Sequence, residues 1–189
     1  MGKPHRILAF FISFLFLLPV FCSPVKIFRI RKIGRAPNFI ALSPDGLKIY
    51  ATSYGSDELL EIDLAQRLLT RSVTVGASPL GVAIADQGKT ALVACKDSNS
   101  VSFVDLESFE VIGDLNVGGQ PNSVAISPRG YQAYVSSYGR TREGLLHIID
   151  VRERSLITSI KVGVTPFAIA VSPATEQVLL SWGATMKFG

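Results

Sequence analysis

The segment SNSVSFVD, at Ser98–Asp105, has a counterpart on each side of it in the chain. DELLEID (Asp57–Asp63) lies upstream and GLLHIID (Gly144–Asp150) lies downstream, and all three end in an apolar residue followed by Asp. Similar words that return at a regular interval indicate an internal structural repeat. The position of a residue within the repeat therefore indicates the strand or turn in which it lies.

Each repeat opens with the motif Gly-x-x-Pro, and an apolar strand follows the Pro. The motif recurs at intervals of 42, 42 and 45 residues, at Gly34–Pro37, Gly76–Pro79, Gly118–Pro121 and Gly163–Pro166. Ala then stands between two larger apolar residues in every copy, as Ala41, Ala83, Ala125 and Ala170. A run without polar alternation predicts a strand covered on both faces. The recurring Ala predicts crowding where such strands converge.

Three further strands fit into each repeat, because β-branched and aromatic residues dominate the rest of it and no stretch has helical spacing. Four short strands and their turns account for a period of about 42 residues. The predicted fold is therefore all-β, a β-propeller of four-stranded antiparallel blades. We expect three complete blades and partial strands at both ends, in units 34–75, 76–117, 118–162 and an incomplete 163–189.

One Asp closes the third strand of each complete unit, at Asp63, Asp105 and Asp150. Since these residues recur one blade apart, they are not expected to form a carboxylate cluster. Each is predicted to cap its own turn to the fourth strand by accepting hydrogen bonds from backbone N–H groups.

The words AYVSS (Ala133–Ser137) and SNSVSFVD, each within a repeat of this length, resemble the YVTN β-propeller repeat family. The resemblance covers Val25 to about Trp182 and implies an exported or surface-layer-like propeller, typically of seven blades. Seven units need about 294 residues, so we expect a truncated reading frame or a partial propeller that requires a partner. A complete four-bladed ring is the alternative. Open blade edges predict self-association.

The first residues predict export from the cytoplasm. Met1–Arg6 is basic and Ile7–Phe21 is almost entirely apolar, which is the pattern of a secretory signal peptide. We predict a signal peptide at 1–22, a propeller domain at 23–189, and a secreted or periplasmic protein; an uncleaved anchor or a lipid anchor on Cys22 is the alternative. Without Lys3 and Arg6 the formal charge falls from +4 to +2, so nucleic acid is not an expected partner.

The sequence offers no set of residues for catalysis. Outside the signal peptide, His147 and Cys95 stand alone and are expected to be ordinary strand residues, with Cys95 half-buried. No Gly-rich phosphate loop is present, and Gly118-Gly119 is interpreted as a blade-opening turn. We therefore predict no catalytic residue, no metal site and no cofactor.

A ligand is expected on the ring face, where loops of successive blades converge. The turns from the fourth to the first strand and from the second to the third strand should meet there. The candidate ligand-binding residues on these turns are Arg35, Asn38, Tyr54, Lys96, Gln120, Asn122, Tyr138, Arg140 and Arg142. Arg and Tyr favour an anionic or planar group.

The predicted function is an exported, non-catalytic binding or scaffold module whose partner is a protein or glycan at the cell envelope. Two alternatives are a lactonase-like propeller hydrolase and a truncated, non-functional fragment of a seven-bladed protein. A lactonase would need a carboxylate or His set on the ring face, often with a divalent cation.

Overall fold

A computed structural model describes residues 30, 33–139 and 143–182 of the chain. The predicted signal peptide, Cys22, Arg140 and Arg142 lie outside the described residues. The described part contains fourteen strands and one short 3-10 turn, Asp86–Gly88. Its few helical residues include no stretch with the length and apolar character that a membrane crossing requires.

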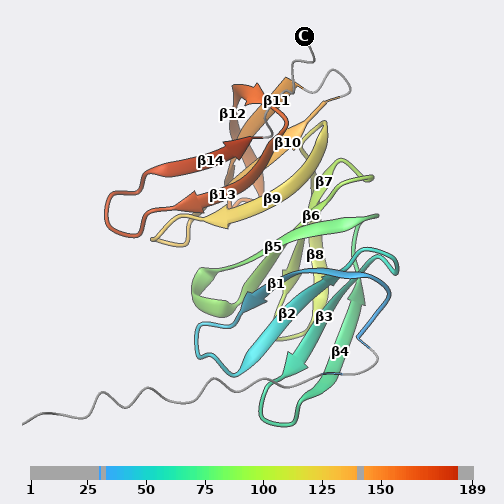
Figure 1. Cartoon of the computed structure of the whole chain (residues 1–189). Helices are drawn as coiled ribbons and strands as arrows, with labels where there is room; N and C mark the ends of the chain where they lie inside the picture. The colour runs from blue at the N-terminus through green and yellow to red at the C-terminus, as the bar shows by residue number, and fades with distance from the viewer. Residues whose placement is uncertain (1–29, 31–32, 140–142, 183–189) are drawn as a thin grey trace, which may run out of the picture.

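The strands form three four-stranded antiparallel sheets and one two-stranded sheet, each in the order of the chain (Figure 1). The first sheet contains β1 (Pro37–Leu42), β2 (Lys48–Ser53), β3 (Glu58–Asp63) and β4 (Leu68–Thr74). The second contains β5 (Pro79–Ala85), β6 (Thr90–Cys95), β7 (Ser100–Asp105) and β8 (Glu110–Asn116). The third contains β9 (Gln120–Ile126), β10 (Gln132–Tyr138), β11 (Glu143–Asp150) and β12 (Ser155–Val164), and the fourth contains β13 (Pro166–Val171) and β14 (Val178–Trp182).

Successive sheets pack face to face, mainly through their first strands. β1 contacts β5, β5 contacts β9, and β9 contacts β13. The four recurring alanines lie on these four strands, as the repeat predicted. The prediction of an all-β fold with four-stranded antiparallel sheets is confirmed.

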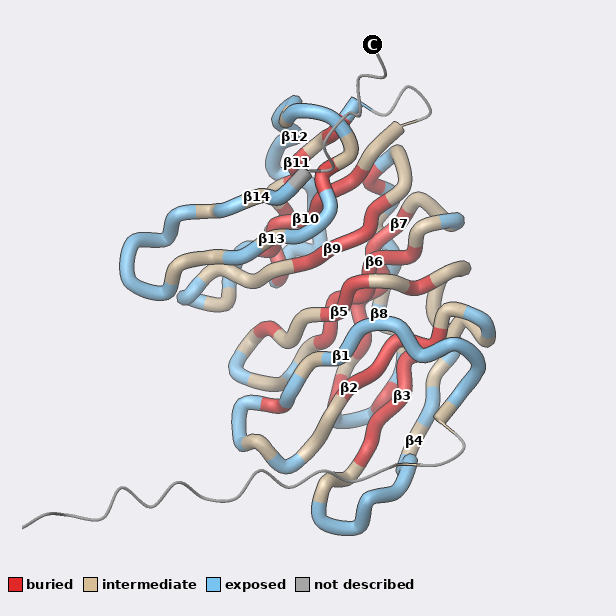
Figure 2. The backbone as a smooth tube through the Cα atoms, in the orientation of Figure 1, coloured by how far each residue is buried: buried red, intermediate tan, exposed pale blue. Residues whose placement is uncertain are grey.

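Two of the three apolar core clusters lie between sheets, and the third lies on the first sheet. Tyr50 and Leu59 of the first sheet pack with Val82, Val93 and Phe109 of the second sheet. The second layer joins Leu92, Val101 and Phe103 of the second sheet to residues of the third sheet, which are Val124, Ala133, Val135 and Ile149. Figure 2 shows this buried core running through the middle sheets. Burial of apolar area between sheets is the main stabilising contribution in a fold of this kind.

The Asp residues after β3, β7 and β11 cap their turns as predicted. Asp63 accepts a hydrogen bond from the backbone N–H of Gln66 at 2.7 Å. Asp105 accepts hydrogen bonds from the N–H groups of Glu107 and Ser108, and these hydrogen bonds lower the pKa of Asp105. In the same way, Asp150 accepts hydrogen bonds from the backbone N–H groups of Arg152 and Glu153.

The prediction that first strands are covered on both faces holds for β5 and β9 and is wrong for β1 and β13. In the described part of the chain no sheet precedes β1 and none follows β14. Five of the six residues of β1 are therefore exposed, whereas most residues of β9 are buried or half-buried (Figure 2).

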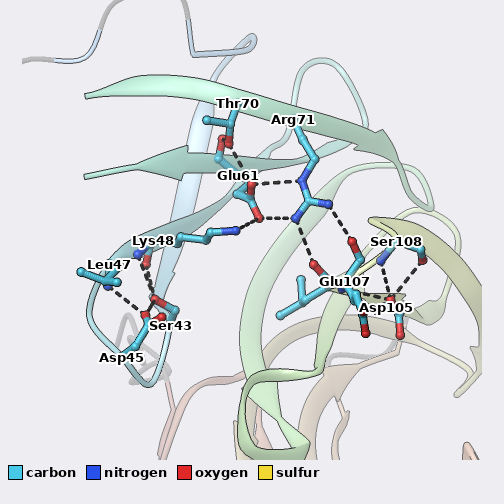
Figure 3. Close-up of polar contacts among 11 residues, drawn as sticks. Ser43, Asp45, Leu47, Lys48, Glu61, Thr70, Arg71, Asp105, Glu107 and Ser108 are labelled. Atoms are coloured by element: carbon cyan, nitrogen blue, oxygen red, sulfur yellow. Dashed lines mark hydrogen bonds and ion pairs between the residues drawn. The ribbon is translucent and has the colours of Figure 1, made fainter. Parts of the chain in front are cut away.

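A buried carboxylate joins the first two sheets. Glu61, whose side chain is 3% exposed, forms ion pairs with Lys48 at 3.0 Å and with Arg71 at 2.6 Å. Arg71 also donates to the main-chain carbonyls of Leu106 and Glu107 in the second sheet (Figure 3). Burial alone would raise the pKa of Glu61, but hydrogen bonds from Arg71, Lys48 and Thr70 outweigh it and lower the pKa to about 2.

Candidate functional site

Two sets of turns meet at one end of the sheets, as the strand order predicted. In the first sheet the N–H groups of Tyr54 and Gly55 donate to the carbonyls of Ala36 and Arg35 at 3.1 and 2.8 Å. The second sheet repeats this contact between the β6–β7 turn and the turn that precedes β5. These bonds hold the two turns of each sheet side by side, and Asp57 of the β2–β3 turn accepts from the N–H of Ser78 before β5 at 2.8 Å. Loops that converge at one end of a rigid scaffold are a common place for a ligand.

A pocket of about 600 Å³ opens at this end between the second and third sheets. It lies between the β6–β7 turn, the end of β8 and the turns around β9 and β10. Its lining consists of Asp97, Asn99, Asn116, Gly118, Gly119, Gln120, Tyr138 and Gly139. The volume falls within the range of about 300–1,000 Å³ that small-molecule sites occupy.

The turn before β9, which lines the pocket, differs from the other three turns. In the other turns the residue just before the Pro has a positive φ, as at Ala36, Ser78 and Thr165. Before β9, Gly118 and Gly119 have the positive φ values, 68° and 70°, and Gln120 is already in the strand. Glycine adopts this conformation without steric cost. A Cβ on Gly118 or Gly139 would meet no atom within 4 Å, so both main chains border open space.

The polar groups of the pocket are neutral amides, one phenol and one carboxylate. Asn116 accepts a hydrogen bond from the N–H of Gly118 at 2.9 Å, which fixes its carbonyl and leaves its amide NH₂ as a donor. Asp97 accepts from the hydroxyl of Ser78 at 2.5 Å and keeps further acceptor capacity. The described lining contains no Lys, Arg or His. These donors and acceptors are suited to hydrogen bonds with hydroxyl groups.

The structure distributes the predicted ligand-binding residues unevenly. Gln120 and Tyr138 are half-buried and line the pocket. Tyr54 and Lys96 lie half-buried at the same end of the sheets, but neither lines it. The remaining described residues of the set are Arg35 and Asn38, exposed at the start of the first sheet, and Asn122, which is buried.

Asn122 has a structural role that its sequence position did not indicate. Its side chain is 6% exposed and accepts a hydrogen bond from the hydroxyl of Ser136. Its amide donates to the carbonyl of Pro166 in β13 at 2.7 Å. Asn122 therefore bridges the third and fourth sheets, as the hydroxyl of Thr52 bridges the first and second by donating to Leu80.

His147 is a buried residue of a hydrogen-bonded row across the third sheet, which the sequence analysis missed. Its Nε2 lies 2.7 Å from the hydroxyl of Ser137, and its Nδ1 lies 2.8 Å from that of Ser159. Burial lowers the pKa of His147. The order Ser–His–Ser resembles a nucleophile, a base and an orienting group, but Ser137 has no exposed surface. The row therefore ties β10, β11 and β12 together.

The matching row in the second sheet supports this structural role. Cys95 lies 3.4 Å from the hydroxyl of Ser102, which donates to Asp114 at 2.5 Å. Cys95 is fully buried rather than half-buried, and burial raises the pKa of its thiol. The alignment of Cys95 with Ser137, and of Asp114 with Ser159, was the signal in the sequence that could have revealed both rows.

The described residues include no group of three or more His, Cys, Asp or Glu side chains placed to hold a metal ion. The candidate site thus consists of the pocket between the second and third sheets. The two hydrogen-bonded rows lie near the same end of these sheets, with Cys95, Ser102, Ser137 and His147 buried and the outer residues Asp114 and Ser159 exposed.

No family model matches the sequence, and neither does any curated protein. The fold is similar to that of hydrazine synthase from Kuenenia stuttgartiensis, with a TM-score of 0.77 and 24% identity over 87% of this chain. It is also similar to a candidate 6-phosphogluconolactonase from Bacteroides uniformis, with a TM-score of 0.65 and 18% identity over 77% of this chain. The chain spans 47% of the length of each. Both are β-propeller folds, and likeness at such identity concerns the fold alone.

Proposed function

We propose that this chain is a partial β-propeller of the YVTN type that acts as an exported, non-catalytic binding module. Its three complete sheets are blades of a period of about 42 residues, and its basic and apolar first residues are an export signal. The ligand occupies the pocket between the second and third sheets. The observation that carries this proposal is the lining of that pocket.

The chemistry of the lining favours a neutral ligand rich in hydroxyl groups, such as a glycan of the cell envelope. Asp97, Asn99, Asn116 and Gln120 can each exchange hydrogen bonds with vicinal hydroxyls. Tyr138 supplies a flat apolar face on which the C–H face of a sugar ring can lie, and a hydroxyl that can bond to it. A few fixed polar groups around one aromatic ring are typical of a specific small-ligand site.

Binding of neutral oligosaccharides tests this function directly. We would titrate the full chain with cellotetraose, maltotetraose and chitotetraose by calorimetry. At least one should bind, and Gln120→Ala and Tyr138→Ala should each weaken its binding by tenfold or more, which corresponds to about 1.4 kcal/mol. Tyr54→Ala is the matched control, because Tyr54 holds the same repeat position in the first sheet but does not line the pocket.

The alternative function is a lactonase-like hydrolase, which the name of the Bacteroides uniformis neighbour raises for that protein. Hydrolysis of a sugar lactone, assayed with and without added Mg²⁺ or Ca²⁺, separates the two functions. Lactone turnover that Tyr138→Ala abolishes would replace the binding module by an enzyme. The absence of binding to any of the three oligosaccharides at millimolar concentration would contradict the glycan ligand.

A further inference from the structure

Among the residues that the structure describes, the first and last sheets each have an apolar face that no other sheet covers. The matching positions of the inner sheets show which contact is absent at each end. Val82 in β5 and Val124 in β9 are each 8% exposed, because the preceding sheet covers them. Ile40 holds the same position in β1 and is 69% exposed, and Leu42 beside it is 57% exposed. We call the strip of Ile40 and Leu42 the leading face.

The opposite end lacks a following sheet. Tyr50, Leu92 and Tyr134 hold one repeat position in the second strands of the first three sheets and are 3%, 0% and 9% exposed. Leu179 holds this position in β14 and is 61% exposed. Ala170, which pairs with Leu179, is also exposed, and Phe167 on the same strand is 64% exposed. We call the patch of Phe167, Ala170 and Leu179 the trailing face.

The residues of the trailing and leading faces occupy the repeat positions that contact each other between the second and third sheets. Between the second and third sheets, Ala83 and Leu92 pack in one cluster with Val124 and Ile126. Ala170 and Leu179 hold the positions of the first pair. Ile40 and Leu42 hold the positions of the second pair. The trailing face therefore carries apolar residues at the positions that pack against a leading face within the chain.

We propose that two copies of this chain associate head to tail, with the trailing face of each copy packed on the leading face of the other. The proposal rests on the propeller architecture proposed above but not on the ligand pocket. Removing Ile, Leu and Phe side chains from water is the driving force, at about 25 cal/mol per Å² of apolar surface. Exposed apolar patches with a complementary surface elsewhere on the molecule favour this kind of association.

A closed pair is expected rather than a filament, because closure covers both apolar faces of each copy. A head-to-tail contact that is made twice around a two-fold axis closes a ring and leaves no open face. The outer part of the first sheet is already covered within the chain, since Ile30 and Ile33 pack with Leu60 and Ile62.

The molar mass of the full chain in solution, measured by light scattering after gel filtration, tests the proposal. The expected mass is that of two copies. Ile40→Glu and Leu179→Glu should each give the mass of one copy with an unchanged β-sheet circular dichroism spectrum. Leu47→Glu is the matched control, because Leu47 is 61% exposed but lies in the β1–β2 turn, away from both faces. It should keep the two-copy mass.

Mixing the two disrupted variants gives a sharper result. A ring of one Ile40→Glu copy and one Leu179→Glu copy has one junction with two native faces and one junction with both substitutions. The mixture should therefore recover a two-copy species that neither variant forms alone. A one-copy mass for the unsubstituted chain, a series of masses above two copies, or a two-copy mass in both variants would overturn the proposal. Oligosaccharide binding is measured separately, so its failure leaves this test unaffected.

Discussion

The contact between the first and second sheets includes a charged cluster beside its apolar layer, whereas the contact between the second and third sheets is apolar at the same repeat position. Glu61 on β3 pairs across to Arg71 on β4 in the first sheet. At the matching places of the second sheet, Phe103 pairs across to Gly113. Both Glu61 and Phe103 are buried, so the two junctions use the same backbone with opposite chemistry.

The chemistry of each cross-strand pair, Glu61–Arg71 or Phe103–Gly113, matches the residues of the following sheet that contact it. The turn after β7 presents the ring of Phe109 and two main-chain carbonyls; the guanidinium of Arg71 lies 4.6 Å from the ring centroid and donates to both carbonyls. The turn after β11 presents Arg154 at the position of Phe109. A Cβ on Gly113 would lie 3.4 Å from Cδ of Arg154, so Gly113 leaves room for the stem of that side chain.

This comparison teaches that the repeat fixes the backbone but not the junction. Phe109 and Arg154 have the same left-handed conformation, with φ of 60° and 49°, in turns capped by the same Asp. Only the side chains at this turn position differ. Phe109 lies against Arg71 of the Glu61–Arg71 pair, and Arg154 lies against Gly113 of the Phe103–Gly113 pair. At this one repeat position, neighbouring sheets are therefore complementary in pairs.

The largest expected effect comes from opening the apolar junction. Phe103→Ala should lower the free energy of unfolding by about 4 kcal/mol, because a fully buried ring is replaced by a cavity. Ile148→Ala changes the matching residue of the third sheet, which is half-buried, and should cost about 2 kcal/mol. Urea unfolding followed by circular dichroism measures both. Equal losses of unfolding free energy for Phe103→Ala and Ile148→Ala would contradict the prediction that the more deeply buried residue contributes more.

The charged junction should be the more sensitive of the two to acid. The pKa of Glu61 is about 2 in the folded chain against an ordinary value of 4.5, so its contribution to stability is complete above pH 4.5 and falls as the pH falls toward 2. Between pH 5 and pH 3 the loss should be about 2 kcal/mol. Urea unfolding at a series of pH values measures it.

Glu61→Gln is the control for this acid effect, because Gln keeps the shape and does not titrate. The lowered pKa of His147 also reduces stability as the pH falls below its ordinary value of 6.5, and that contribution remains in the variant. The difference between the two pH profiles therefore reports Glu61 alone. Parallel profiles between pH 5 and pH 3 would contradict the role assigned to the ion pairs.

The sequence predicted the parts of the fold that repeat. The Pro, Ala and Asp of each unit recur at fixed places because the backbone needs them there: Asp105, for example, accepts from the N–H groups of its turn in the way its position indicated. Strand order followed from the period, and so did the end of the sheets at which Gln120 and Tyr138 meet.

The parts that differ between units could not be predicted in the same way. Gly119 could be recognised as a turn residue, but neither its positive φ of 70° nor its place in the pocket lining could be predicted. Asn122 shares its repeat position with the exposed Asn38, although both strands have a following sheet. The hydroxyl of Thr52 makes the bridge from the first sheet, whereas the amide of Asn122 makes it from the third. The residue that forms the bridge changes from unit to unit, so one unit of sequence does not predict it for the next.

The smallest expected effect tests whether a turn cap supports the charged junction. Asp105 holds the turn whose carbonyls, those of Leu106 and Glu107, accept from Arg71. Asp105→Ala should cost about 1 kcal/mol for the lost hydrogen bonds. Since Arg71 depends on the same turn, Asp105→Ala and Arg71→Ala should be non-additive by about 0.5 kcal/mol or more in a double-mutant cycle.

Asp150→Ala provides the matched cap for this cycle, because it holds the turn of Arg154 and not the one that Arg71 contacts. The losses in free energy of unfolding from Asp150→Ala and Arg71→Ala should be additive. Coupling of Arg71 to both Asp105 and Asp150 would mean that the two contacts between sheets are energetically linked through the second sheet. Coupling to neither cap would mean that Glu61 and Phe109 are sufficient to hold Arg71 in place. The ion pairs of Glu61 would then not depend on the conformation of the turn after β7.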